Sequence, residues 1–154
     1  MSAYYFDSSG IVKRYIAETG SLWVGQVTEP ASGNPILTSI IRGAEVVAAI
    51  CKRERGGSIT SDEMHLVLTA FKVDFRSQLL VGEISHQIVD KAMILAEQYG
   101  LRGYDSVQLA TALMLQQERI VLALPSLIFV SADDKLNAAA QAEGLQVENP
   151  AHHT

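Results

Sequence analysis

Short apolar runs alternate along the chain with longer stretches whose apolar residues recur at helical spacing. The short runs predict β-strands at residues 4–6, 36–37, 79–81, 127–130 and 145–147. The longer stretches predict helices at residues 8–16, 21–27, 39–55, 61–71, 85–99, 104–118 and 135–143. Strands that alternate with helices are typical of an α/β fold, so we expect a mainly parallel central sheet covered by helices on both faces.

The length and composition are those of one globular domain. The chain has 154 residues, 48% hydrophobic and 19% charged, and we expect a single domain over residues 1–150 followed by a disordered tail over 151–154. The longest apolar run, Ile120 to Val130, is interrupted by Pro125 and falls short of the ~20 residues that a membrane span needs. The N-terminus lacks the basic start and long apolar stretch of a signal peptide. We therefore expect a cytoplasmic protein that does not associate with a membrane.

The single cysteine and the net charge narrow the choice of function. Cys51 follows the apolar residues from Val46 to Ile50, which favours a buried, inert thiol over a nucleophile. The net charge of -5 argues against a broad basic surface for nucleic acid. Carboxylates gathered around a divalent cation also make a chain acidic, so a metal-dependent nuclease stays open.

Four carboxylates occupy positions where the topology can bring them together: Asp7, Glu45, Asp105 and Asp133. Asp7 follows the first predicted strand, and Asp133 comes just after the strand that ends near Val130. Ligands of parallel α/β sheets bind beyond the carboxyl ends of the strands. Glu45 borders the apolar face of a helix, and Asp105 opens another helix. These four side chains are the candidates for one acidic site.

The carboxylates of such a site repel one another unless a cation or protons neutralise their charge. Since the ligands are all oxygen atoms, the expected metal is Mg²⁺ or Mn²⁺. Such a metal lowers the pKa of a bound water and stabilises the charge on a departing oxygen, which suits cleavage of a phosphodiester. The chain has no GxGxxG or P-loop motif, which argues against a nucleotide site of either kind.

Each acid also has a purely structural explanation when it is taken alone. Asp7, Asp105 and Asp133 stand at predicted helix starts, where aspartate is a favoured capping residue. Glu45 can instead form a surface ion pair with a basic neighbour such as Arg42. Only the combination of the four positions favours a site.

A resemblance to a known family rests on four segments, in this order and spacing: YYFDSSGIVKRYIAETGS, AEVVAAICKRERGG, LRGYDSVQLATAL and FVSADDKLNAAAQAEGLQVENP. Together they resemble the PIN domain of VapC-type toxins over nearly the whole chain. The resemblance implies a three-layer α/β/α sandwich, and the family's acidic positions fall on Asp7, Glu45, Asp105 and Asp133.

The resemblance also implies an activity. It is that of a Mg²⁺-dependent endoribonuclease, the toxin of a toxin–antitoxin pair, which cuts single-stranded or loop RNA and leaves a 5′ phosphate and a 3′ hydroxyl. Ser9 and Ser131 would orient a carboxylate or a water, with helix or turn capping as the alternative. Asp133 matches the family's SAD triplet, and Asp134 would cap the last helix, although the sequence allows the two to exchange roles.

Two protein partners follow from the same resemblance, a second copy of the chain in a homodimer and a small antitoxin. The antitoxin would dock in a groove beside the helices between Ser21 and Phe71. Trp23, Val27 and Leu66, with Phe71, are candidates to line this groove, and packing in the core is the alternative for each of them.

Three other functions stay open. A PIN-like nuclease that processes RNA and is not a toxin would have the same site. A non-catalytic module could bind RNA or protein, although a binding surface has no need to gather negative charge near a phosphate backbone. A phosphatase of the haloacid dehalogenase type would use Asp7 as nucleophile, but such enzymes carry a second aspartate two residues later, where this chain has Ser9.

Overall fold

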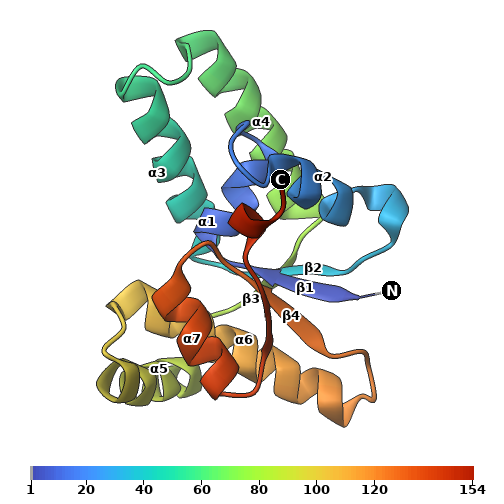
Figure 1. The fold of residues 1–154 in the computed structure, drawn as a ribbon, viewed down its shortest axis with the longest axis vertical. Coiled ribbons are helices and arrows are strands. Elements are labelled where there is room, and N and C mark those ends of the chain that lie inside the picture. The colour runs from blue at the N-terminus through green and yellow to red at the C-terminus, as the bar shows by residue number, and fades with distance from the viewer. Residues whose placement is uncertain (1) are drawn as a thin grey trace.

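The α/β architecture is confirmed by the computed structural model, which describes residues 2–154 (Figure 1). The sheet has five strands in the order β3-β2-β1-β4-β5, and each neighbouring pair is parallel. The strands are β1 (Ala3–Phe6), β2 (Ile36–Ser39), β3 (Leu80–Gly82), β4 (Leu127–Val130) and β5 (Gln146–Glu148). The α-helices are α1 (Ser8–Ile11), α2 (Ser21–Thr28), α3 (Arg42–Arg55), α4 (Ser61–Ser77), α5 (His86–Tyr99), α6 (Gly103–Val121) and α7 (Asp134–Ala142). Short 3-10 helices are η1 (Val12–Arg14), η2 (Pro30–Ser32) and η3 (Pro150–His152).

Helices cover both faces of the sheet, as the three-layer prediction requires. In Figure 1, α2, α3 and α4 lie on one side of the sheet and α5, α6 and α7 on the other. Each layer has its own hydrophobic core, one containing Phe6 and Phe71 and the other containing Tyr5 and Leu109. Tyr5 and Phe6 enter different cores because successive strand residues point to opposite faces. None of the helices in residues 2–154 combines the length and hydrophobicity needed to cross a membrane.

Helices α1 and α4 begin at the predicted residues, and side-chain caps fix both starts. The first helix ends early, because α1 tightens into η1 and stops at Arg14 rather than at Ile16. Its capping residue is Asp7, whose side chain accepts a hydrogen bond from the backbone of the first turn. Helix α4 is capped by Thr60 in a reciprocal arrangement with Glu63, which satisfies two free backbone donors at once.

The parallel sheet brings three strand ends to one edge. Phe6 of β1 is in register with Val130 of β4, and the Asp7 backbone N–H donates to the Val130 carbonyl at 3.1 Å. Strand β2 lies on the other side of β1 and ends at Ser39, shortly before α3 begins. The segments that follow β1, β2 and β4 therefore meet at this edge.

The prediction of a disordered tail is wrong for Ala151 to His153. Ala151 and His152 belong to η3, and the ring of His153, the residue after it, stacks on the Trp23 indole with centroids 4.3 Å apart and planes at 4°. The His153 Nε2 atom also lies 2.9 Å from a carboxylate oxygen of Glu148. An aromatic surface and an acid of the domain hold the end of the chain in place.

Candidate active site

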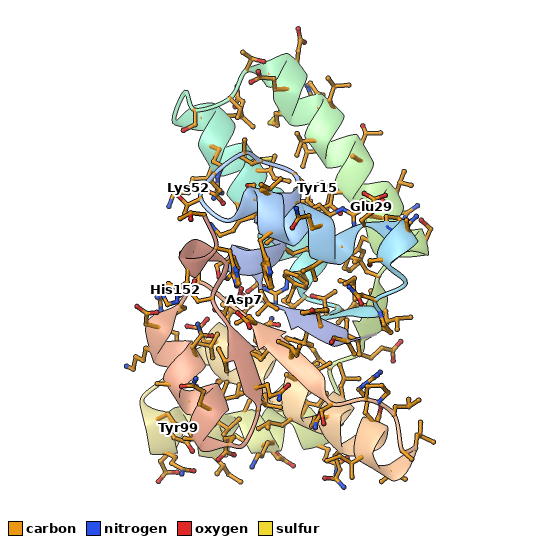
Figure 2. All side chains as sticks on the ribbon, turned by 45° about the vertical axis from the view of Figure 1, so that its right-hand side comes forward. Asp7, Tyr15, Glu29, Lys52, Tyr99 and His152 are labelled. Atoms are coloured by element: carbon orange, nitrogen blue, oxygen red, sulfur yellow. The ribbon has the colours of Figure 1, made fainter. Side chains whose placement is uncertain are left out.

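Asp7 is a buried carboxylate held by three hydrogen-bond donors. Only 4% of its surface is exposed. Ser9 Oγ donates to Asp7 Oδ1 at 2.6 Å, Ser131 Oγ donates to Oδ2 at 2.6 Å, and the Gly10 backbone N–H donates to Oδ1 at 2.9 Å. Figure 2 shows Asp7 near the middle of the molecule, between the helices of the two layers. Hydrogen bonds to the charged form of a carboxylate compensate for its lost hydration, so Asp7 is fixed in position.

The turn after β4 is tied to Asp7 by the two serines. The Ala132 backbone N–H donates to Ser9 Oγ at 2.9 Å, and the Asp133 backbone N–H donates to Ser131 Oγ at 3.0 Å. The structure thus brings both predicted serines to Asp7 and to the turn that carries Asp133. Each serine contacts a carboxylate or its backbone.

The neighbouring acids Asp133 and Asp134 point to different partners. Asp133 Oδ1 caps α7 by accepting from the Leu136 backbone N–H at 3.0 Å, and its Oδ2 atom lies 3.8 Å from Arg102. Asp134 instead accepts a hydrogen bond from the Asn149 side chain at 3.1 Å. The prediction that Asp134 caps the last helix is therefore wrong: Asp133 is the cap, and the same side chain faces the other acids.

Glu45 lies in the first turn of α3 and pairs with a buried arginine. Arg42 Nη1 lies 3.0 Å from Glu45 Oε2, and Gln108 Nε2 approaches the same oxygen at 3.5 Å. Arg42 is completely buried, whereas the Glu45 side chain is 20% exposed. The pair is an internal ion pair, and the surface pair considered from the sequence does not describe it.

Asp105 shows that the acids share one electrostatic environment. Burial raises the pKa of the Asp105 carboxyl above its ordinary value, and the negative charge of Asp133 adds to the rise. Arg102, whose Nε atom is 3.5 Å from Asp105, acts in the opposite direction. Asp7 and Glu45 contribute smaller increases. The charges of Asp133, Asp7 and Glu45 thus all act on the pKa of Asp105.

The donor types in this cluster fit a hard divalent cation, because all of the candidate ligands are carboxylate oxygens. Burial is the larger cause of the raised Asp105 pKa, and the negative charge of Asp133, which adds to it, is of the kind that a cation relieves. In the arrangement described for residues 2–154, no group of three or more histidine, cysteine, aspartate or glutamate side chains is placed so that it could hold a metal ion. Positive charge near these acids comes from two arginines: Arg42 pairs with Glu45, and Arg102 pairs with Asp105 and Asp133.

Known proteins resemble this chain both in sequence and in structure. No family model matches the chain. Two curated proteins of Mycobacterium tuberculosis, named ribonuclease VapC45 and ribonuclease VapC49, are each 29% identical to it over 147 residues, covering 96% of this chain and 95% of the relative. Among solved structures, a toxin–antitoxin complex from Klebsiella pneumoniae matches with a TM-score of 0.62 and 18% identity, over 96% of this chain and 97% of that one.

A second solved structure carries the family's name. It is VapBC2 from Rickettsia felis bound to a DNA fragment from its promoter, with a TM-score of 0.59 and 18% identity over 96% of this chain and 98% of that one. The chain thus resembles VapC ribonucleases in sequence and VapC-type toxin–antitoxin structures in fold. Its relatives and these structural neighbours are matched over nearly their full length, so the resemblance covers the whole described chain.

Two residues that contact Glu45 were not among the predicted site residues. Gln108 is 2% exposed, and it links Tyr5, Ser39, Arg42 and Glu45. A polar residue within an apolar helical stretch, three positions after Asp105, is the only hint available from the sequence. Arg42 was considered only as a surface partner of Glu45, since nothing nearby in the chain indicates that it is buried.

The four residues predicted to line an antitoxin groove do not form one surface. Val27 and Phe71 are buried in the core of the domain, which was the alternative for each of them. Trp23 is half-buried beneath His153. Leu66 of α4 is 73% exposed.

Proposed function

We propose that this chain is a metal-dependent endoribonuclease of the PIN-domain type whose Mg²⁺ or Mn²⁺ is held by Asp7, Glu45, Asp105 and Asp133. The observation that carries the proposal is the set of contacts that joins the acids: Ser131 bonds both the Asp7 carboxylate and the Asp133 backbone, and Arg102 lies beside both Asp105 and Asp133. The names of the two mycobacterial relatives, both ribonucleases, support the same reaction class. When bound, the cation supplies an activated water and stabilises charge on the departing oxygen.

The residues of the chain have distinct tasks in this proposal. Ser9 and Ser131 fix both oxygens of Asp7, so that the carboxylate needs no reorganisation when substrate arrives. Arg102 has an 86% exposed side chain beside two of the acids, where its guanidinium can meet an RNA phosphate. The substrate phosphate then takes the place of Asp105 and Asp133 as its partner.

We also infer that the enzyme is the toxin of a toxin–antitoxin pair, a cytoplasmic protein restrained by a small antitoxin. Support comes from the structural neighbours, which are described as a toxin–antitoxin complex and as VapBC2. A pocket of about 510 Å³ lies between the loop at Tyr15 and the α3–α4 hairpin, where Arg53 and Val67 line it. This pocket replaces the predicted groove as the candidate docking place, and the descriptions of the structural neighbours favour a toxin over an RNA-processing PIN nuclease.

The homodimer remains part of the proposal. Exposed apolar side chains are found on α5, where Met93 is 60% exposed, and at the end of α6, where Val121 is 74% and Leu122 is 67% exposed. A second copy that covers such residues would remove apolar surface from water. Sedimentation of the purified protein gives the oligomeric state directly.

The test of the activity is a cleavage assay on RNA with protein freed of any antitoxin. Wild type is incubated with labelled total RNA in Mg²⁺ or in EDTA, next to Asp7→Asn and to Asp90→Asn, an exposed acid of α5 outside the site. We expect discrete cuts with wild type and Asp90→Asn in Mg²⁺ alone, and none with Asp7→Asn. Equal cleavage by Asp7→Asn, or no cleavage by wild type with either Mg²⁺ or Mn²⁺, would favour the non-catalytic module.

A further inference from the structure

Arg42 is a completely buried arginine at the start of α3, directly behind the acidic site. A buried guanidinium costs free energy unless it is paired and its N–H groups are hydrogen-bonded. Here Nε donates to Thr38 Oγ1 at 3.0 Å, Nη1 donates to Glu45 Oε2 at 3.0 Å, and Nη2 donates to Gln108 Oε1. Each nitrogen of the fork therefore has its own partner on a different element.

Hydrogen bonds with residues of β1 and β2 hold the partners of Arg42 in place. Gln108 Oε1 also accepts hydrogen bonds from the Tyr5 hydroxyl at 2.6 Å and from Ser39 Oγ at 3.0 Å. Thr38 Oγ1 donates to the Phe6 carbonyl at 3.2 Å. These groups are buried, and burial raises the pKa of Tyr5 to about 12, so its hydroxyl remains a donor at neutral pH. The arginine thus sits in a rigid polar network between β1, β2 and α6.

The network acts on one oxygen of Glu45. Within residues 2–154, the hydrogen bonds to this carboxylate come from Arg42 and Gln108, and both end on Oε2. The other oxygen, Oε1, accepts no hydrogen bond from the described part of the chain. A carboxylate held by one oxygen keeps a defined orientation and leaves the other free for a ligand.

We propose that Arg42 is a positioning residue of the metal site, a buried fork that fixes Glu45 through Oε2 and leaves Oε1 as the ligand oxygen. The inference rests on the proposed metal-dependent function. It differs from a simple charge effect, since a positive charge alone would weaken cation binding by repulsion, whereas an oriented carboxylate strengthens it. Arg42→Lys distinguishes the effect of charge from the effect of orientation, because an ammonium keeps the charge but cannot reach three partners on three elements.

The test measures Mn²⁺ affinity of the full chain by calorimetry, without RNA. Wild type, Arg42→Lys, Glu45→Gln and the double variant form a cycle that isolates the coupling between the two residues. We expect Arg42→Lys to weaken Mn²⁺ binding by roughly tenfold or more, as removal of outer-shell partners commonly does. In the Glu45→Gln background the same change should have no further effect. Arg119→Lys is the matched control, because Arg119 is a buried arginine that donates to the Pro125 carbonyl at the other end of α6.

Each outcome decides between distinct conclusions. If wild type binds Mn²⁺ and Arg42→Lys binds it equally well, or if the loss is the same with and without Glu45, Arg42 does not position Glu45 while the proposed function stands. If wild type binds no Mn²⁺, the metal-dependent function fails and the role of Arg42 fails with it. Should Arg42→Lys not fold, as judged by circular dichroism, Tyr5→Phe replaces it in the cycle. This variant removes one donor from Gln108 and leaves two in place, and a coupling to Glu45 smaller than that of Arg42→Lys but in the same direction is expected.

Discussion

At the scale of single residues, an aspartate that caps a helix can still belong to the candidate site. Asp7 caps α1 and Asp133 caps α7, yet each retains carboxylate contacts at the site. This is possible because an ionised carboxylate accepts hydrogen bonds at two oxygens and from several directions. The capping bond and the serine contacts then help to hold the side chain where the site needs it.

Removing the Ser131 hydroxyl should damage the site more than the fold. Ser131→Ala deletes the donor to Asp7 Oδ2 and the acceptor of the Asp133 backbone N–H. We expect RNA cleavage to fall by about 10–100-fold and stability to fall by roughly 1–3 kcal/mol, because a buried donor is left without a partner. Thr28→Val is the control, since the Thr28 hydroxyl is buried and donates only to the Val24 carbonyl. Equal cleavage rates for the two variants would contradict a role for Ser131 at the site.

Because the pKa of Asp105 is raised, replacing this carboxyl with a neutral group should stabilise the folded protein, and the effect should depend on pH. A carboxyl whose folded-state pKa is raised destabilises the folded protein above that pKa, and the penalty disappears below the unfolded value of about 3.9. Asp105→Asn should therefore raise the Tm of the metal-free protein near neutral pH by about 1–2 °C. The gain should vanish near about pH 4. Thermal unfolding in EDTA at both pH values is the measurement, and a lower Tm for the variant at neutral pH would contradict a raised pKa of Asp105 caused by burial and by the charge of Asp133.

At the scale of elements, the strands and the placement of Asp7 and Asp133 at one sheet edge could be predicted, because both depend on local pattern and on a general rule. Apolar runs mark parallel strands, and the residues that follow them meet at one sheet edge. The network behind Glu45 could not be predicted, since Arg42 and Gln108 are 66 residues apart and their contact exists only after α3 and α6 pack on the sheet. The ordered tail was missed for the same reason: the ring that covers His153 belongs to α2.

The junction between α2 and the end of the chain predicts opposite effects for two glycines. Gly20 has φ +89°, and a Cβ there would lie 2.3 Å from the Pro150 carbonyl oxygen, whereas a Cβ at Gly25 in α2 meets nothing within 4 Å. We expect Gly20→Ala to lower the free energy of unfolding by about 2–3 kcal/mol and Gly25→Ala to raise it by about 0.5–1 kcal/mol. Urea denaturation compares them, and a neutral Gly20→Ala would mean that the Pro150 segment does not pack there.

At the scale of the whole molecule, the acidic site lies on the seam between the two helical layers. Glu45 belongs to α3, which packs in one layer, and Asp105 belongs to α6, which packs in the other, as Figure 1 shows. A cation shared by these acids would therefore link the layers across the edge of the sheet.

This position predicts that metal binding stabilises the entire domain. At a Mn²⁺ concentration of about 100 times Kd, mass action adds roughly 2.7 kcal/mol to the free energy of unfolding, which corresponds to a rise in Tm of about 5–10 °C. The rise should be much smaller in Glu45→Gln. Scanning calorimetry with and without Mn²⁺ measures both. An unchanged Tm for wild type would show that the folded protein does not bind the cation, and an equal rise in Glu45→Gln would place cation binding outside this seam.

The measurement that tests the central claim most directly is the Mg²⁺-dependent rate at which one RNA is cleaved by Asp133→Asn and by Asp134→Asn. Both changes are isosteric, asparagine can still cap α7, and only Asp133 contacts the acidic cluster. We expect Asp133→Asn to lose about 100-fold or more of the wild-type rate, and Asp134→Asn to retain most of it. Equal rates for the two variants, or a loss confined to Asp134→Asn, would contradict the site described here.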